Sequence, residues 1–284
     1  MATLSIVPFL NVLYEVSTLA VLVLGLAVIF GLLGVLNLAH GEFIMMGAYS
    51  AYLVETAGLP FVTAIPLTML ICGVLGFAVE RWLIRPLYKR PFDTLIATWG
   101  LGLLLRKVAE AVFGLGYKSV TVPLPGTISI AGDSYPTYRL VLIAASVAIL
   151  ISLVVWFTRS YVGMRIRAME SNPDLADAVG IPVRRLASQT FIVGTCLAGL
   201  GGVAIAPLVS VQPYMGLDYV LRAFFALVIG GLGSVVGVLL GSTVIGGLDS
   251  TVSALTDGTF GYFSVLVVSV LFLWLKPRGI YASA

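Results

Sequence analysis

Long apolar runs recur along the whole chain and limit the folds open to it. The longer ones approach or exceed the roughly 20 residues that a helix needs to cross a bilayer. They fall at residues 11–36, 61–83, 93–113, 139–158, 186–209 and 260–275, with shorter runs at 41–56, 219–233 and 235–254. The runs lack the alternation of a membrane β-barrel, and only helices or closed barrels satisfy their backbone in lipid. The sequence therefore predicts an all-α polytopic membrane protein with one transmembrane domain over residues 1–284.

The few charges show how the spans are oriented. Charged residues make up 10% of the 284 residues, against about 25% in soluble domains. Of the 16 Lys and Arg residues, four lie in 81–91, five in 159–185 and two in 276–278. The positive-inside rule places these three segments, and so the C-terminus, in the cytoplasm. The bundle then has nine passes and an outer N-terminus if 41–56 crosses fully, or eight passes and an inner N-terminus if 41–56 is re-entrant. No basic residue precedes the first run, which we expect to be retained rather than cleaved as a signal peptide.

Polar residues interrupt the apolar sequence between the first two runs. Asn37, His40, Gly41 and Glu42 form this break, and His40 is the only histidine in the chain. A charge at the centre of a membrane helix costs roughly 2.5 kcal/mol or more, so such residues usually face a bundle interior or a wet cavity and often mark a solute path. The alternative is that His40 and Glu42 lie near the headgroups and only cap a helix.

A second break gives the chain a weak internal repeat. It lies between two apolar segments and contains Gly230, Gly231, Gly233 and Ser234. Paired, glycine-interrupted segments in the two halves of a transporter are typical of a midplane site, because they expose backbone and helix ends there. We therefore predict that both breaks line a translocation path. The glycines are equally compatible with a tight helix-packing surface.

Three smaller features complete the pattern outside these breaks. Residues 114–138 are rich in Gly and Pro and partly alternating (Val120 and Val122, then Ile128 and Ile130), which predicts an extracytoplasmic hairpin. Late in the fourth span, Arg106, Lys107 and Glu110 are interpreted as a snorkelling interfacial cluster. The two cysteines, Cys72 and Cys196, fit no metal-ligand spacing. The sequence predicts no metal site and no catalytic residue.

The cytoplasmic loop at 159–185 contains the signals of one short helix. Asn172 suits the N-cap, Pro173 the first helical position and Asp174 the first turn. Gly180 suits the C-terminal cap, and Pro182 stops the helix. The predicted apolar face consists of Leu175, Ala176, Ala178 and Val179. This face must be buried on the protein's own spans, in the lipid interface or in a partner's groove.

The motifs together resemble one family over nearly the whole chain, from about residue 20 to the basic tail at 276–279. The resemblance is carried by three stretches: GLAVIFGLLGVLNLAHGEFIMMGAY, RAMESNPDLADAVGIPVRRLASQTFIVGTCLAGLGGVAIAP and FALVIGGLGSVVGVLLGSTVIGGL. They are similar to the membrane subunits of branched-chain amino acid ABC importers, in particular to the shorter, H-type permease.

The resemblance implies partners that composition does not show. These are a homologous second permease in a heterodimer, two cytoplasmic ABC ATPases and a periplasmic or lipid-anchored solute-binding protein, in a bacterial or archaeal inner membrane. The helix over 172–180, with Glu170 just before it, would dock in an ATPase cleft. ATP and Mg²⁺ would be used by the partners, since this chain lacks a GxxxxGK[ST] loop. We expect no cofactor on this chain, and lipid but no nucleic acid as a further partner.

The solute class remains open at this point. The family resemblance favours branched-chain amino acids, and permeases of urea and short-chain amide importers share the same motifs. Asn37, His40 and Glu42 can serve either solute. A secondary transporter would need an ion-coupling carboxylate such as Glu42, Asp218 or Asp249, but it would leave the cytoplasmic helix unexplained. A hydrolase with Ser234 and His40 lacks a GxSxG motif, and a channel lacks a filter motif.

Overall fold

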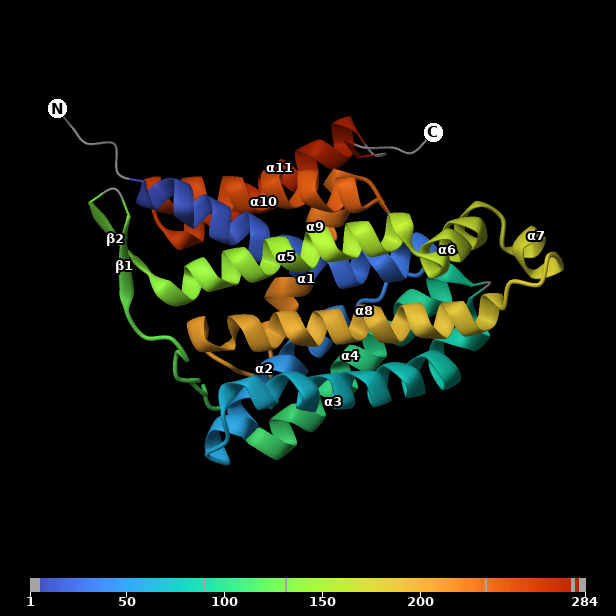
Figure 1. Cartoon of the computed structure of the whole chain (residues 1–284), viewed down its shortest axis with the longest axis horizontal. Helices are drawn as coiled ribbons and strands as arrows, with labels where there is room; N and C mark the ends of the chain where they lie inside the picture. The colour runs from blue at the N-terminus through green and yellow to red at the C-terminus, as the bar shows by residue number, and fades with distance from the viewer. Residues whose placement is uncertain (1–5, 89, 131, 233, 277–278, 281–284) are drawn as a thin grey trace.

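The computed structural model describes residues 6–88, 90–130, 132–232, 234–276 and 279–280. Within these residues the chain is mainly helical, and Figure 1 shows the long helices lying side by side. The α-helices are α1 (Val7–Leu33), α2 (His40–Thr56), α3 (Ala64–Val79), α4 (Pro91–Phe113), α5 (Thr137–Arg159), α6 (Tyr161–Ser171), α7 (Pro173–Ala178), α8 (Val183–Ile205), α9 (Met215–Gly230), α10 (Val235–Leu255) and α11 (Gly258–Leu275).

Six helices of the described chain are long and apolar enough to span a membrane. They are Val7–Leu33, Phe61–Leu87, Thr137–Arg159, Val183–Leu208, Val236–Leu255 and Gly258–Leu275. The predicted all-α polytopic membrane protein is thus confirmed. Helices α2, α4 and α9 do not belong to these six, so the predicted eight or nine passes stay a prediction.

The helix ends refine the predicted spans. The first span begins earlier than residue 11 and ends at Leu33, because Gly34 takes a left-handed conformation (φ 62°) and its N–H bonds the carbonyl of Phe30. The third span continues past residue 83. A π-helical turn (Glu80–Ile84) and a 3-10 turn (Arg85–Leu87) extend α3, which itself follows another short 3-10 turn (Phe61–Thr63).

The two ends of the bundle carry different elements (Figure 1). One end carries the antiparallel hairpin of β1 (Thr127–Ile130) and β2 (Asp133–Pro136), in which Ile128 pairs with Tyr135. Helices α6 and α7 lie at the other end. A hairpin thus lies within the predicted segment 114–138, but Val120 and Val122 lie outside its strands, and its extracytoplasmic side stays a prediction. Near them, Lys118 forms an isolated two-way backbone pair with Val211, after the end of α8.

Glycines let the central helices approach to backbone contact. A Cβ added to Gly47 of α2 would overlap the carbonyl oxygen of Gly199 on α8, and one added to Gly202 would overlap that of Ile44. Membrane helices associate largely through such close packing of small residues. Helices α1, α2 and α8 therefore form the buried centre of the bundle, and this places the polar break at residues 37–42 inside it.

Candidate functional site

The polar break begins as an irregular segment after α1 and ends in the first turn of α2. Asn37 accepts a hydrogen bond from Ala39 N through Oδ1 (3.1 Å), and its carbonyl accepts from His40 N (3.1 Å). Leu38 N donates to Thr98 Oγ1 on α4 (3.2 Å). Side chains and local turns thus satisfy backbone that no helix satisfies, as irregular chain inside a membrane bundle requires.

His40 ties the start of α2 to the middle of α1. Its side chain is fully buried, and Nε2 lies 2.8 Å from the carbonyl oxygen of Leu22. Since a carbonyl only accepts, Nε2 carries the proton in this arrangement. Nδ1 has no hydrogen-bond partner among the described residues. His40 therefore lies inside the bundle as the first residue of α2, and its depth in the membrane stays a prediction.

Glu42 is buried two residues further along α2 and pairs with α4. Arg106 Nε lies 2.9 Å from Glu42 Oε1, and the two side chains are 9% and 1% exposed. The interpretation of Arg106 as a snorkelling residue is therefore wrong, because its charge is neutralised by a carboxylate inside the bundle. Lys107 and Glu110, by contrast, form an outward pair (2.6 Å) that also contacts the hydroxyl of Tyr214.

The helix that meets the break is α9. Gly41 in the first turn of α2 and Gly216 in the first turn of α9 touch through their backbones, and a Cβ on either would overlap the other. The N-terminal ends of two helices, each with a partial positive charge, therefore meet inside the bundle. The sequence reasoning missed this pairing; the glycine within Tyr-Met-Gly, just before the apolar run of α9, was its signal.

The second predicted break does not show this contact. Gly230 packs tightly on Gly237 of α10, Gly231 lies against Gly279, and the hydroxyl of Ser234 caps α10 by accepting from Gly237 N (3.2 Å). Gly233 lies outside the described residues. Residues 230–234 therefore join two packed helices, and their role in a path stays a prediction.

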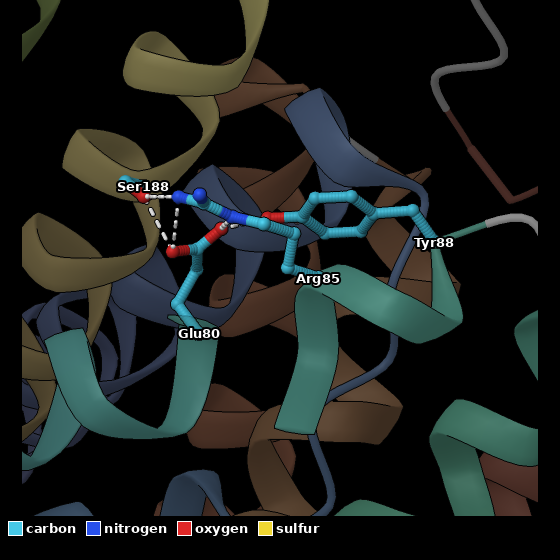
Figure 2. A network of polar contacts seen from close by, with 4 residues as sticks. All are labelled: Glu80, Arg85, Tyr88 and Ser188. Atoms are coloured by element: carbon cyan, nitrogen blue, oxygen red, sulfur yellow. Dashed lines mark hydrogen bonds and ion pairs between the residues drawn. The ribbon is translucent and has the colours of Figure 1, made fainter. Parts of the chain in front are cut away.

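A buried carboxylate network anchors the far end of α3, as Figure 2 shows. Glu80, in the π-helical turn, accepts from Arg85 Nε (3.1 Å), Arg85 Nη2 (3.0 Å) and the Tyr88 hydroxyl (2.8 Å). Ser188 on α8 also donates to Glu80 and accepts from Arg85 (2.6 Å). From the sequence, Arg85 was interpreted only as a positive charge, and no local signal predicted this network. The π-helical turn that carries Glu80 is of a kind that often occurs at functional sites.

The segment at 159–185 contains more helix than predicted. Residues 161–171 form α6, where the sequence analysis expected loop; Ser160 caps it by accepting from Gly163 N (2.9 Å). The predicted signals of α7 are confirmed. Asn172 Oδ1 accepts from Leu175 N (2.9 Å), and Gly180 follows the helix in a left-handed conformation (φ 87°). Asp174 lies in the first turn, as expected.

The predicted apolar face of α7 is partly buried and partly exposed. Ala176 is buried (3% exposed) and packs with Ile166, Met169 and Leu186 of α6 and α8. Leu175 (61%) and Val179 (68%) are exposed, and so is Ala178. The protein's own helices thus hold α7 through Ala176 and leave two large apolar side chains uncovered.

An apolar groove of about 810 Å³ lies between α1, α5, α6, α8 and the start of α10. It brings together two predicted site residues that are distant in sequence, Glu170 and Ser234. Partial burial raises the pKa of the Glu170 carboxyl above its usual range. Elsewhere in the described chain, no group of three or more His, Cys, Asp or Glu residues could hold a metal ion.

Comparison with known proteins shows which family has this sequence. A family model described as "Branched-chain amino acid transport system / permease component" matches residues 9–275. The chain belongs to this family. Permeases of the family with similar sequences include LivH of Salmonella typhimurium, 25% identical over 282 residues that cover 93% of this chain and 91% of LivH. BraD of Pseudomonas aeruginosa is 26% identical over 284 residues, with the same shares. Both are described as high-affinity branched-chain amino acid transport system permease proteins.

Two further similarities extend the picture. The ribose import permease RbsC of Haemophilus influenzae is 25% identical over 278 residues, 93% of this chain and 82% of RbsC. The solved structure of PsaBC from Streptococcus pneumoniae in complex with Fab matches with a TM-score of 0.52 and 15% identity, over 95% of this chain and 92% of that one. At that identity the structural match shows a shared fold only. The match to the branched-chain permease family thus covers the chain from α1 to α11.

Proposed function

We propose that this chain is the membrane permease subunit of an ATP-driven importer that takes up branched-chain amino acids. The family match over residues 9–275 and the LivH and BraD relatives support the solute class. Neither these relatives nor RbsC favours the alternative of urea or short-chain amides. The chain itself does not hydrolyse ATP. A homologous second permease, two ATPases and a solute-binding protein complete the importer.

Helix α7 transmits the work of the ATPases to the bundle. The observation that carries this proposal is the exposure of Leu175 and Val179 on a helix that is capped at both ends and held through Ala176. An apolar pair on a fixed short helix fits a groove on a partner, and burying such a side chain contributes roughly 1.5–3 kcal/mol. Network contacts between Glu80, Arg85 and Ser188 then link the start of α8, just after α7, to α3.

The experiment replaces Leu175 with Asp in the reconstituted importer and measures ATP-driven leucine uptake and co-purification of the ATPases. The matched control is Leu115→Asp, since Leu115 is also exposed but follows α4 at the opposite end of the bundle. We expect Leu175→Asp to lose uptake and ATPase retention while the control keeps both. Normal uptake by Leu175→Asp would refute the coupling role. Ala176 is unsuitable for this test because its substitution would disturb α6 and α8 directly.

The proposed topology has nine passes with an outer N-terminus and a cytoplasmic C-terminus. Its support is that Ile6 N, at the start of α1, donates to Asp133 of the hairpin (3.1 Å), so α1 begins at the end opposite α6 and α7. Residues 277–278 of the basic tail lie outside the described residues. An impermeant maleimide added outside whole cells should label Phe9→Cys and spare Leu175→Cys; the opposite labelling would reverse the orientation.

The translocation path passes the junction of α2 and α9. Support comes from the buried polar groups of Asn37, His40 and Glu42 beside two helix N-termini. We propose that the counterpart of residues 37–42 in the second half of the chain is the start of α9, rather than residues 230–234. Cysteine at Asn37 should react with a small aqueous thiol reagent in at least one nucleotide state. A thiol that stays inert in every state would make the break a packing feature.

A further inference from the structure

A polar cavity lies in the half of the bundle that carries the hairpin. It has a volume of about 160 Å³ and is enclosed by residues of α1, α5, α9, α10 and the end of α8. That is roughly ten times the space of about 10–15 Å³ that one water needs. Leu22 forms part of its wall, and the carbonyl of Leu22 bonds His40, so the cavity borders the polar break of α2.

The charged residues of this cavity balance one another. Arg222 Nη1 pairs with Asp249 Oδ2 (2.6 Å), and Glu15 interacts electrostatically with both and with Arg139. Arg139 donates to Asn11 Oδ1 (3.1 Å) and lies over the ring of Tyr14. Within the described chain, neither Glu15 nor Arg139 forms an ion pair of its own. Besides the pair of Arg222 and Asp249, the lining thus offers the carboxylate of Glu15 and the guanidinium of Arg139. Because a buried charge without a partner is costly, both groups favour a bound ligand of opposite charge.

Two buried polar atoms of the lining also lack a partner. The hydroxyl of Thr18 (9% exposed) and Nε of Arg222 make no hydrogen bond with any described residue. Buried polar groups are otherwise nearly always satisfied, so such atoms indicate a bound molecule or ordered water. Both are donors that a carboxylate would accept from.

The remaining wall of the cavity is apolar. It consists of aliphatic side chains from four elements: Leu19 and Leu22 of α1, Ile205 of α8, Leu208 just beyond it and Ile245 of α10. A site with a few convergent polar groups and an otherwise apolar lining is the usual form of a small-molecule pocket. A ligand with an ammonium, a carboxylate and an aliphatic side chain would match all three parts of the lining.

We infer that this cavity binds a zwitterionic aliphatic amino acid within the single permease subunit. The ammonium pairs with Glu15, the carboxylate accepts from Thr18 and from the guanidinium groups of Arg222 and Arg139, and the side chain contacts the leucines of α1. The inference deepens the proposed function and rests on it for the class of solute. It adds a binding site beside the polar break, on the hairpin side.

The test uses the complete importer in nanodiscs, without nucleotide and without the solute-binding protein, and measures equilibrium binding of tritiated leucine. We expect saturable binding that weakens at least tenfold in Glu15→Gln and several-fold in Thr18→Val, because each loses one contact to a charged group. Glu110→Gln, the same change in a carboxylate outside the cavity, should leave binding unchanged. Leucinamide and N-acetyl-leucine, which each lack one charge, should compete at least tenfold less well than leucine.

Further outcomes separate this inference from the proposed function. Thr18→Val keeps the shape of its side chain, so it remains informative if Glu15→Gln does not assemble. Unchanged binding in the assembled variants, or equal competition by the blocked analogues, would overturn the site. Absence of leucine binding from an importer that takes up leucine with its binding protein would do the same and leave the function intact. Failure of the unmodified importer to take up leucine would instead refute the function.

Discussion

The buried pair of Glu42 and Arg106 gives the sharpest test of how this bundle is held together. Replacing Glu42 by Met removes the carboxylate and leaves the Arg106 side chain, which is only 9% exposed, without its partner. Breaking a buried pair from one side costs about 3–5 kcal/mol, whereas replacing both partners by apolar residues is often neutral. The pair has one contact of 2.9 Å, and Glu42 Oε2 has no partner among the described residues. We therefore expect Glu42→Met to lower the free energy of unfolding by about 3 kcal/mol, the lower end of this range.

The expected loss can be read as a shift in melting temperature. With an unfolding entropy of roughly 2.1 cal/mol/K per residue over 284 residues, about 3 kcal/mol corresponds to about 5 °C. The assay is thermal unfolding in detergent, followed with a fluorogenic maleimide. Cys72 is fully buried and serves as the reporter in a Cys196→Ala background, because its thiol reacts only when the bundle opens.

A double-mutant cycle decides whether the pair is responsible. Glu42→Met and Arg106→Met should each lower the melting temperature by about 5 °C, and the double variant should recover most of that loss. Asp93→Asn, which breaks the exposed pair of Arg90 and Asp93 (3.7 Å), should change it by less than about 1 °C. Single losses no larger than this control, or a double loss equal to the sum of the singles, would refute the reasoning.

Three other predictions follow from the described contacts. Gly47→Ala should prevent stable assembly, because its Cβ overlaps the carbonyl of Gly199, whereas Gly100→Ala, with open space around it, should be neutral in size-exclusion profiles. Glu80→Gln should lower the melting temperature by several degrees and reduce uptake, since a neutral amide cannot replace the acceptor of four donors. Glu170→Gln should slightly raise the melting temperature at neutral pH, because partial burial raises the pKa of Glu170 in the folded state and so disfavours its charged form there. The gain should vanish in melts at acid pH, where the Glu and Gln side chains are both neutral.

Local signals along the chain were enough to predict most helices and their ends. The apolar runs predicted the helical regions to within a few residues, and Asn172, Pro173 and Gly180 predicted α7. Each of these signals acts within one or two turns of its own backbone. Helix α6 was missed because its mixed composition, with Arg165 and Arg167, gives no strong apolar periodicity.

Partners across the bundle could not be predicted in the same way. Glu42 lies 64 residues before Arg106, and Glu80 lies 108 residues before Ser188. Whether two such groups meet depends on the depth and rotation of each helix, which packing against its neighbours sets. The π turn at Glu80 adds a further shift, because it rotates the following residues relative to a regular helix.

The sequence by itself determined that this chain is a helical membrane protein, that its break at residues 37–42 is unusual and that α7 is a capped helix. It did so because hydrophobicity, capping and turn chemistry act locally. Only the tertiary structure decided that Arg106 neutralises Glu42, that Gly41 meets Gly216 of α9 and that Leu175, not Ala176, faces outward from α7. These outcomes depend on which helices touch, and the close approach of backbones at glycines decides that in lipid.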